Sequence, residues 1–171
     1  MPVIRRHQAE GVTSWASYSD CETYRYALCR TWAPTGRRLT FVMLNPSRAT
    51  ELANDPTIGR CESRARRLGY GAMMVVNLFA LRETDPRAMK AHAAPIGPAT
   101  DAALLEAADW ADDLIAAWGV HGVHLGRDKS VLALLRDAGH APLVLGLTKA
   151  GHPRHPLYLP NVVRPMLWAA P

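Results

Sequence analysis

The sequence predicts an α/β fold: a three-layer domain with about four parallel strands between helices and an N-terminal antiparallel strand at one edge. Three observations predict it. The chain has 171 residues without an internal repeat or a Ser/Gly linker, so we expect one domain over residues 1–171. Short apolar runs alternate with segments of helical periodicity, as in βαβ units. These runs are almost continuously apolar, which is typical of strands covered on both faces.

The first two predicted strands lie on either side of a turn. Residues 22–32 alternate and are rich in aromatic and β-branched side chains. The segment 33–36 contains proline and glycine, and an apolar strand follows at 39–44. We therefore expect a hairpin in which residues 22–32 form the antiparallel edge strand.

The rest of the chain alternates between helix and strand. Asp55 and Pro56 fit an N-cap and a first-turn proline, and apolar residues at helical spacing follow as far as Leu68. The later elements are predicted as strands at 72–76, 113–119 (with a turn) and 143–147, helices at 98–111 and 131–138, a proline-rich loop at 149–160, and a short C-terminal helix.

Composition limits the class of protein. The net charge is +5 and the two ends of the chain are basic around an acidic middle, which favours an anionic partner; an incidental arginine excess is the alternative. No apolar run reaches the about 18 residues of a membrane span, and the N-terminus lacks an apolar signal core, so we expect a cytoplasmic protein. Three cysteines disfavour a disulfide framework. The oligomeric state stays open.

Distinctive polar residues follow the predicted strands. In open parallel sheets, ligands bind at the carboxyl ends of the strands. Four segments stand at such ends: Asn45-Pro46-Ser47, Asn77-Leu78-Phe79, Trp118-Gly119, and the loop with His152 and His155. We therefore expect a ligand site at this edge of the sheet.

Each of these residues has a functional and a structural interpretation. Asn45 could hold a water or a base edge, or simply open a turn stiffened by Pro46. Asp55 could be a catalytic acid or only a helix cap. Asn77 could pair with a nucleobase edge or with its own loop, and Phe79 could stack on a base or belong to the core.

The basic residues and histidines suggest how a phosphate would be held. His155 could donate a proton or stabilise an oxyanion. Arg60 and Arg64 on the predicted helix, with Lys149 and Arg154 in the loop, could contact phosphates or simply be solvated. No third ligand stands near His152 and His155, so neither a metal nor an organic cofactor is predicted.

Several segments resemble a known family. The runs MLNPSRATELANDPTIGRC, VVNLFALRETDP, AAWG and GHPRHPLYLP resemble domain-of-unknown-function family 1643 over about residues 20–165. Their order is also similar, more distantly, to the uracil-DNA glycosylase superfamily. That resemblance implies that Asn45 positions the attacking water, Asn77 reads the base edge and His155 stabilises the leaving base. Ser47 stands where the superfamily has glycine.

These observations lead to one hypothesis and two alternatives. The hypothesis is a nucleic-acid-directed enzyme of glycosylase-like architecture that hydrolyses an N-glycosidic bond, with DNA or a nucleotide as partner. Asn45, Asp55 and His155 would be catalytic, and a base would lie against the following residues: Pro46, Ser47, Asn77, Phe79 and Trp118. The alternatives are an enzyme acting on a free nucleotide or small anionic metabolite, and a non-catalytic nucleic-acid-binding module. Whether the chain is an enzyme stays open.

Overall fold

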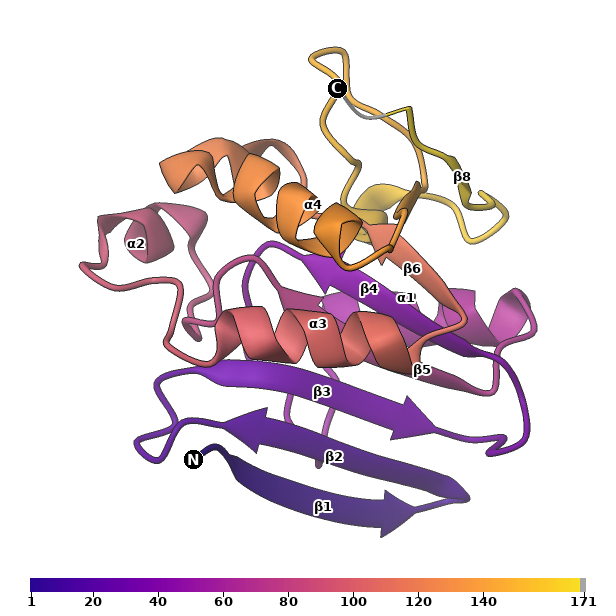
Figure 1. The fold of residues 1–171 in the computed structure, drawn as a ribbon. Coiled ribbons are helices and arrows are strands. Elements are labelled where there is room, and N and C mark those ends of the chain that lie inside the picture. The colour runs from indigo at the N-terminus through magenta and orange to yellow at the C-terminus, as the bar shows by residue number, and fades with distance from the viewer. Residues whose placement is uncertain (170–171) are drawn as a thin grey trace.

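The computed structural model describes residues 1–169 as a mixed α/β fold built on one sheet (Figure 1). The sheet has eight strands in the order β1-β2-β3-β5-β4-β6-β7-β8. The strands are β1 (Val3–Ala9), β2 (Val12–Tyr18), β3 (Arg25–Thr31), β4 (Arg38–Met43), β5 (Ala72–Asn77), β6 (Asp113–Ala116), β7 (Leu143–Val144) and β8 (Met166–Leu167). The α/β class predicted from the sequence is confirmed.

Strand direction divides the sheet into three parts. Strands β1, β2 and β3 form an antiparallel meander, and β3 continues antiparallel onto β5. Strands β5, β4, β6 and β7 are neighbours paired in parallel. Strand β8 closes the other edge in antiparallel pairing with β7. The connections from β4 to β5 and from β5 to β6 lead to opposite sides of β4, which makes β4 and β6 the switch point of the parallel part.

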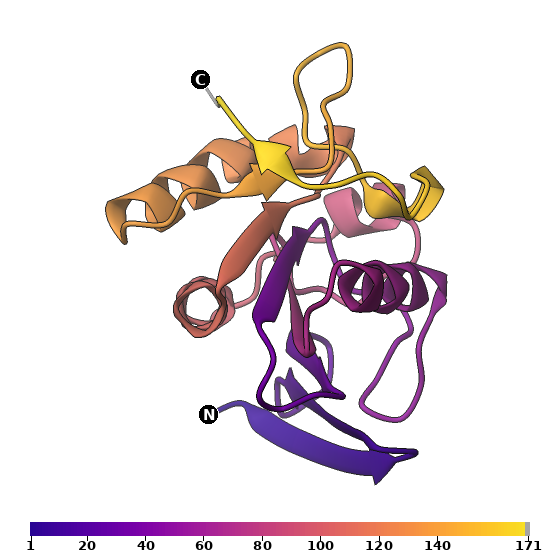
Figure 2. The same ribbon diagram turned by 90° about the vertical axis from the view of Figure 1, so that its right-hand side faces the viewer.

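Helices cover both faces of the parallel part (Figure 2). They are α1 (Pro56–Arg67), α2 (Pro86–Ala91), α3 (Thr100–Trp110) and α4 (Arg127–Asp137), with 3-10 turns η1 (Val120–Gly126) and η2 (Pro156–Tyr158). Helices α3 and α4 pack on one face through residues such as Leu104 and Val131, and α1 packs on the other through Ile58 and Cys61. Within residues 1–169 no helix combines the length and apolar character of a membrane span.

The predicted hairpin and edge strand are wrong. Strand β5 lies between β3 and β4, so residues 22–32 contribute an inner strand, and the unpredicted hairpin of β1 and β2 extends the sheet beyond it. The chain between β3 and β4 forms no hairpin turn. It binds the residue before β5, because the Trp32 and Ala33 amides donate to the Gly71 carbonyl. A Cβ at Gly71 would lie 2.1 Å from the Ala33 oxygen, so only glycine fits this crossing.

The C-terminal prediction is also wrong. The segment after Pro160 contains the short strand β8 and no helix within residues 161–169. A one-turn helix, η2, lies earlier, inside the predicted loop at 149–160. Pro160 precedes the segment and Pro165 lies within it, and the residue before a proline is disfavoured in helical conformation, so the chain runs extended instead.

Candidate functional site

A cavity opens at the carboxyl ends of β4 and β6, the switch point of the sheet. This upper cavity has a volume of about 480 Å³. Five segments line it, namely residues 44–48, 55–57, 83–86, 118–121 and 155–158. Three of them contain strand-end residues predicted from the sequence: Asn45 and Ser47, Trp118, and His155. A cavity of ligand size therefore lies at the switch point, which is where ligands bind in open α/β sheets.

A second, smaller cavity lies against the sheet. This lower cavity has a volume of about 40 Å³, room for a few water molecules. It shares Asn45, Ser47, Asp55, Thr57 and His155 with the upper cavity. The residues that only the lower cavity contacts are Arg25, Met43, Pro46, Ile58, Val75 and Asn77. The structure thus brings together three separately predicted residues, Asn45, Asn77 and His155.

Asn77 is the most unusual side chain in the lower cavity. It is the last residue of β5 and only 2% exposed. Neither Nδ2 nor Oδ1 has a hydrogen-bond partner in the part of the chain that is described. A buried amide without partners costs about 1–3 kcal/mol. The side chain is therefore available to a ligand with one donor and one acceptor.

Asn45 is partly held by the loop after β5. Its Nδ2 donates to the Glu83 carbonyl at 2.7 Å and to the Pro46 carbonyl at 3.2 Å. These bonds fix the amide orientation and leave Oδ1 as the free acceptor, with no partner among residues 1–169. Oδ1 can accept a hydrogen bond from a water in the cavity.

Asp55 is the N-cap of α1, as its place before Pro56 predicts. Oδ1 accepts from the Ile58 amide at 2.9 Å. Oδ2 accepts from the amides of Arg48 at 3.3 Å and Ala49 at 3.2 Å. Both carboxylate oxygens are thus engaged by backbone, which fixes the loop between β4 and α1 against the helix. The cap interpretation is confirmed, while a catalytic role stays a prediction.

His155 lines both cavities and is a hydrogen-bond donor there. Its Nδ1 accepts from the Leu157 amide at 3.2 Å, so the proton of the neutral ring lies on Nε2. Burial lowers the pKa of His155 below its ordinary value, against a smaller raising effect of Asp55. The ring is therefore neutral at pH 7 and donates from Nε2.

Arg25, the first residue of β3, was not predicted to belong to the site. Its side chain is buried, with 1% of the residue exposed, and Nη1 donates to the Ala49 carbonyl at 2.8 Å. Burial lowers the pKa of Arg25 to about 10, so the guanidinium remains charged at neutral pH. An arginine at the start of an apolar strand was the sequence signal, but nothing local indicates its burial.

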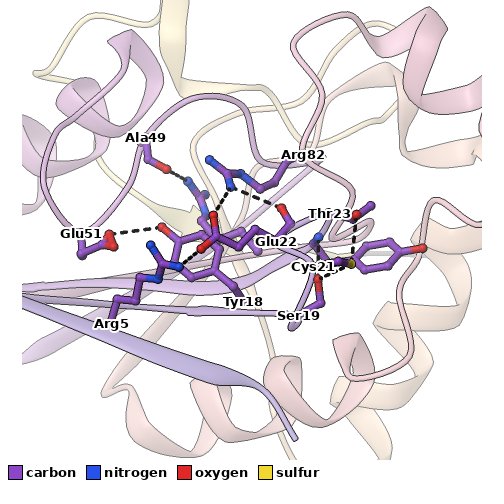
Figure 3. A network of polar contacts seen from close by, with 11 residues as sticks. Arg5, Tyr18, Ser19, Cys21, Glu22, Thr23, Ala49, Glu51 and Arg82 are labelled. Carbon is purple, nitrogen blue, oxygen red and sulfur yellow. Dashed lines mark hydrogen bonds and ion pairs between the residues drawn. The ribbon is translucent and has the colours of Figure 1, made fainter.

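A polar network supports the loop that carries Asn45 and Asp55. Tyr18 donates to Glu51 at 3.4 Å, and Glu22 pairs with Arg5 and Arg82 (Figure 3). Both guanidinium groups lie over the Tyr18 ring, at 5.8 Å and 5.2 Å from its centroid. The contacts tie the hairpin of β1 and β2 to the loop that contains Glu51. The N-terminal strands therefore contribute to the placement of the site.

Two of the predicted site residues belong to the packed interior. Phe79 is fully buried in the core, where it packs beside His124 with ring centroids 5.6 Å apart, and it lines neither the upper nor the lower cavity. This burial fits the core interpretation, and stacking on a base stays a prediction. Arg64 is also fully buried and donates to the carbonyls of Val163 and Leu159. These contacts fit a structural role for Arg64, and a phosphate contact stays a prediction.

The other predicted phosphate contacts lie outside the two cavities. Arg60 donates to the Leu159 carbonyl, and Arg154 donates to the Leu147 carbonyl at 3.2 Å. Lys149 is exposed. A further cavity of about 750 Å³ lies against α4 and is lined by His152, and Trp118 lines both this cavity and the upper cavity. Within residues 1–169 no three His, Cys, Asp or Glu side chains cluster as metal ligands.

The comparisons with known proteins identify a family and no relative of known activity. Searches of curated proteins and of solved structures found no match. A family model described as a protein of unknown function, DUF1643, matches residues 25–157. The matched region spans every residue that lines the lower cavity. Because the model covers more than half of the chain, the protein belongs to the DUF1643 family.

Proposed function

We propose that the two cavities bind a nucleotide unit and that the protein hydrolyses its N-glycosidic bond. The observation that carries this proposal is Asn77, a buried amide with two unpartnered polar atoms beside Asn45 and His155. A nucleobase edge presents a donor and an acceptor side by side, which is the complement of a side-chain amide. The upper cavity has the volume for the ring and sugar.

The proposed reaction uses two side chains, Asn45 and His155. A water that donates a hydrogen bond to Asn45 Oδ1 attacks C1′ of the sugar. The C1′–N bond breaks, and its electron pair leaves with the base. His155 Nε2–H stabilises the negative charge on the base, as a neutral donor does for a developing anion. The proton lost by the water ends on the base, so the products are a free base and a sugar with a hydroxyl at C1′.

The architecture supports the same proposal. The neighbouring parallel strands β5, β4, β6 and β7, with helices on both faces, fit a glycosylase-like core. In this arrangement the motifs at Asn45, Asn77 and His155 come from three segments far apart in the sequence and meet at one edge. Fold likeness alone does not establish an activity, so the proposal depends on the site.

A free nucleotide is the second candidate substrate. Among the residues that line the upper cavity in the described chain, Arg48 is the only arginine or lysine. Arg60 and Arg64 are occupied by backbone carbonyls of the C-terminal segment. DNA binding normally requires several accessible cations along a phosphate track, so this scarcity favours a small ligand.

The test offers both kinds of substrate to the same protein. Single- and double-stranded oligonucleotides containing uracil or hypoxanthine are assayed by cleavage at abasic sites, and dUMP and dIMP by chromatography of the released base. We expect product from at least one class, and loss of product in Asn45→Ala and His155→Ala. His152→Ala, in the same loop but outside both cavities, is the matched control. Equal product from Asn45→Ala and the native chain would contradict the proposal.

A further inference from the structure

One of the residues that line the lower cavity, Arg25, carries a buried positive charge. Arg25 forms no ion pair within residues 1–169, and its Nε has no hydrogen-bond partner. A buried, uncompensated charge destabilises a protein strongly, so such groups are usually paired. The acids around Arg25 are engaged elsewhere: Asp55 by three backbone amides and Glu51 by Tyr18.

The charges around Arg25 act in both directions. Burial has the largest effect and lowers the pKa of Arg25; Asp55 and Tyr18 raise it, and the smaller effects of Arg82 and Arg30 lower it. Glu22, the acid nearest to Arg82 in the network of Figure 3, also pairs with Arg5. A ligand oxygen in the lower cavity would supply the hydrogen-bond acceptor that Arg25 Nε lacks within residues 1–169.

Arg25 differs from the other buried arginine of β3. Arg30 is 4% exposed and donates from Nη2 to the Thr50 carbonyl at 2.6 Å and to Asn54 Oδ1 at 3.0 Å. It therefore anchors the loop after β4, and it lines neither the upper nor the lower cavity. Arg25 also touches that loop, through Ala49, but it lines the lower cavity together with Asn77, and its Nε has no partner within residues 1–169.

Asn77 alone cannot distinguish between two kinds of base edge. A side-chain amide pairs with a lactam edge, in which a ring N–H adjoins a carbonyl. When the amide group is rotated by a half-turn, it pairs with an amidine edge, in which a ring nitrogen adjoins an amino group. No hydrogen bond fixes the orientation of Asn77 within residues 1–169. A neighbouring group that can only donate removes this ambiguity, and a guanidinium is such a group.

We infer that Arg25 determines the specificity of the site, because its donors require an oxygen at the ligand position that they face. The site then takes bases with a carbonyl next to a ring N–H and rejects those with an amino group at the same position. This inference rests on the proposed function, because it assumes that a base edge enters the lower cavity. It adds a residue from β3, a strand outside the parallel part of the sheet.

The experiment compares ligands that differ only in that group. Binding of uridine and cytidine, and of inosine and adenosine, is measured by calorimetry with the native chain and with Arg25→Met. We expect the native chain to bind the oxo member of a pair at least about tenfold more tightly, a preference within the range of one good base contact. Arg25→Met should bring this ratio close to one. Arg30→Met, which loosens the same loop, should keep the native ratio.

A second variant and a second readout keep the outcomes separate. Arg25→Lys retains a charged donor, so if Arg25→Met fails to fold by circular dichroism, Arg25→Lys should still prefer the oxo ligands. An unchanged ratio in a folded Arg25→Met, or no binding of any of the four nucleosides, would overturn the inference. Selective binding without release of base would support Arg25 as the specificity residue. It would contradict only the proposed hydrolysis.

Discussion

Two buried polar residues, Arg25 and Asn77, carry most of the argument at the residue scale. Each has unpartnered atoms, and both line the same small cavity. Burying such groups lowers the stability of the free protein, because their water hydrogen bonds are lost without replacement. A ligand that restores these bonds stabilises the folded state by its own binding free energy.

Replacing Asn77 with leucine should raise stability. The variant removes an unsatisfied amide and places methyl groups beside Val75 and Ile58, so we expect a gain of about 1–2 kcal/mol in the free energy of unfolding in urea. Thr40→Val is the control, because the Thr40 hydroxyl donates to the Ala107 carbonyl at 3.0 Å and its loss should destabilise. An Asn77→Leu variant less stable than the native chain would argue against an unsatisfied amide.

The pKa of His155 makes stability depend on pH. Burial lowers it below the unfolded value of 6.5, so the unfolded state binds more protons between the two pKa values. The contribution of neutral His155 to stability is therefore fully present above pH 6.5. It is lost as the pH falls through 6.5 toward the pKa of the folded state.

His155→Asn should flatten this decrease, measured by urea unfolding at several values between pH 7 and about pH 5. The pKa of His121 is lowered in the same direction, first by burial and then by Lys90, so part of the slope should persist in the single variant. The double variant with His121→Asn should be flatter still. A steeper slope in His155→Asn would exclude the proposed cause.

At the scale of elements, α1 organises the site from both of its ends. Its N-cap Asp55 holds the loop after β4, while Arg60 and Arg64 hold the carbonyl of Leu159, four residues after His155. The arginines predicted to contact phosphate thus have a positioning role for the C-terminal segment. A helix whose side chains hold both loops of the site fixes the position of Asn45 relative to His155.

The two aspartate caps should differ in importance. Asp55→Ala loses three backbone hydrogen bonds and should lower the free energy of unfolding by about 2 kcal/mol, at the upper end for N-caps. Asp85→Ala, at the exposed start of α2, loses one amide bond and the contact to Arg87, so its loss should be smaller. Urea unfolding of both variants checks this order; equal losses would show that the Arg48 and Ala49 contacts contribute nothing.

For the whole molecule, local patterns predicted elements but not their neighbours. Asp55-Pro56 identified α1, and the apolar runs identified β4 and β5, because these signals are contained within each segment. The insertion of β5 between β3 and β4 depends on long-range pairing, which no local pattern records. Strand β1 is exposed along nearly its whole length and so has no apolar face to detect. The burial of Arg25 is likewise a product of tertiary packing.

The exposure of β1 predicts an uneven stability across the sheet. Within residues 1–169, strand β1 pairs only with β2, whereas β4 and β5 are buried and paired on both sides. Amides of residues 3–9 should therefore exchange with deuterium well before those of β4 and β5, followed by mass spectrometry of peptic fragments. Protection of β1 equal to that of β5 would mean that another chain covers this edge.

The polarity of β3 has a consequence for what a sheet edge can hold. Parallel strands deliver their last residues to the ligand edge, as β5 delivers Asn77. Strand β3 runs the other way, so its first residue, Arg25, arrives at the same edge. A parallel strand in that position would have brought Thr31 there, with Arg25 at the far edge. An antiparallel neighbour is thus a way to place a cation from the start of a strand among the amides at the ends of parallel strands.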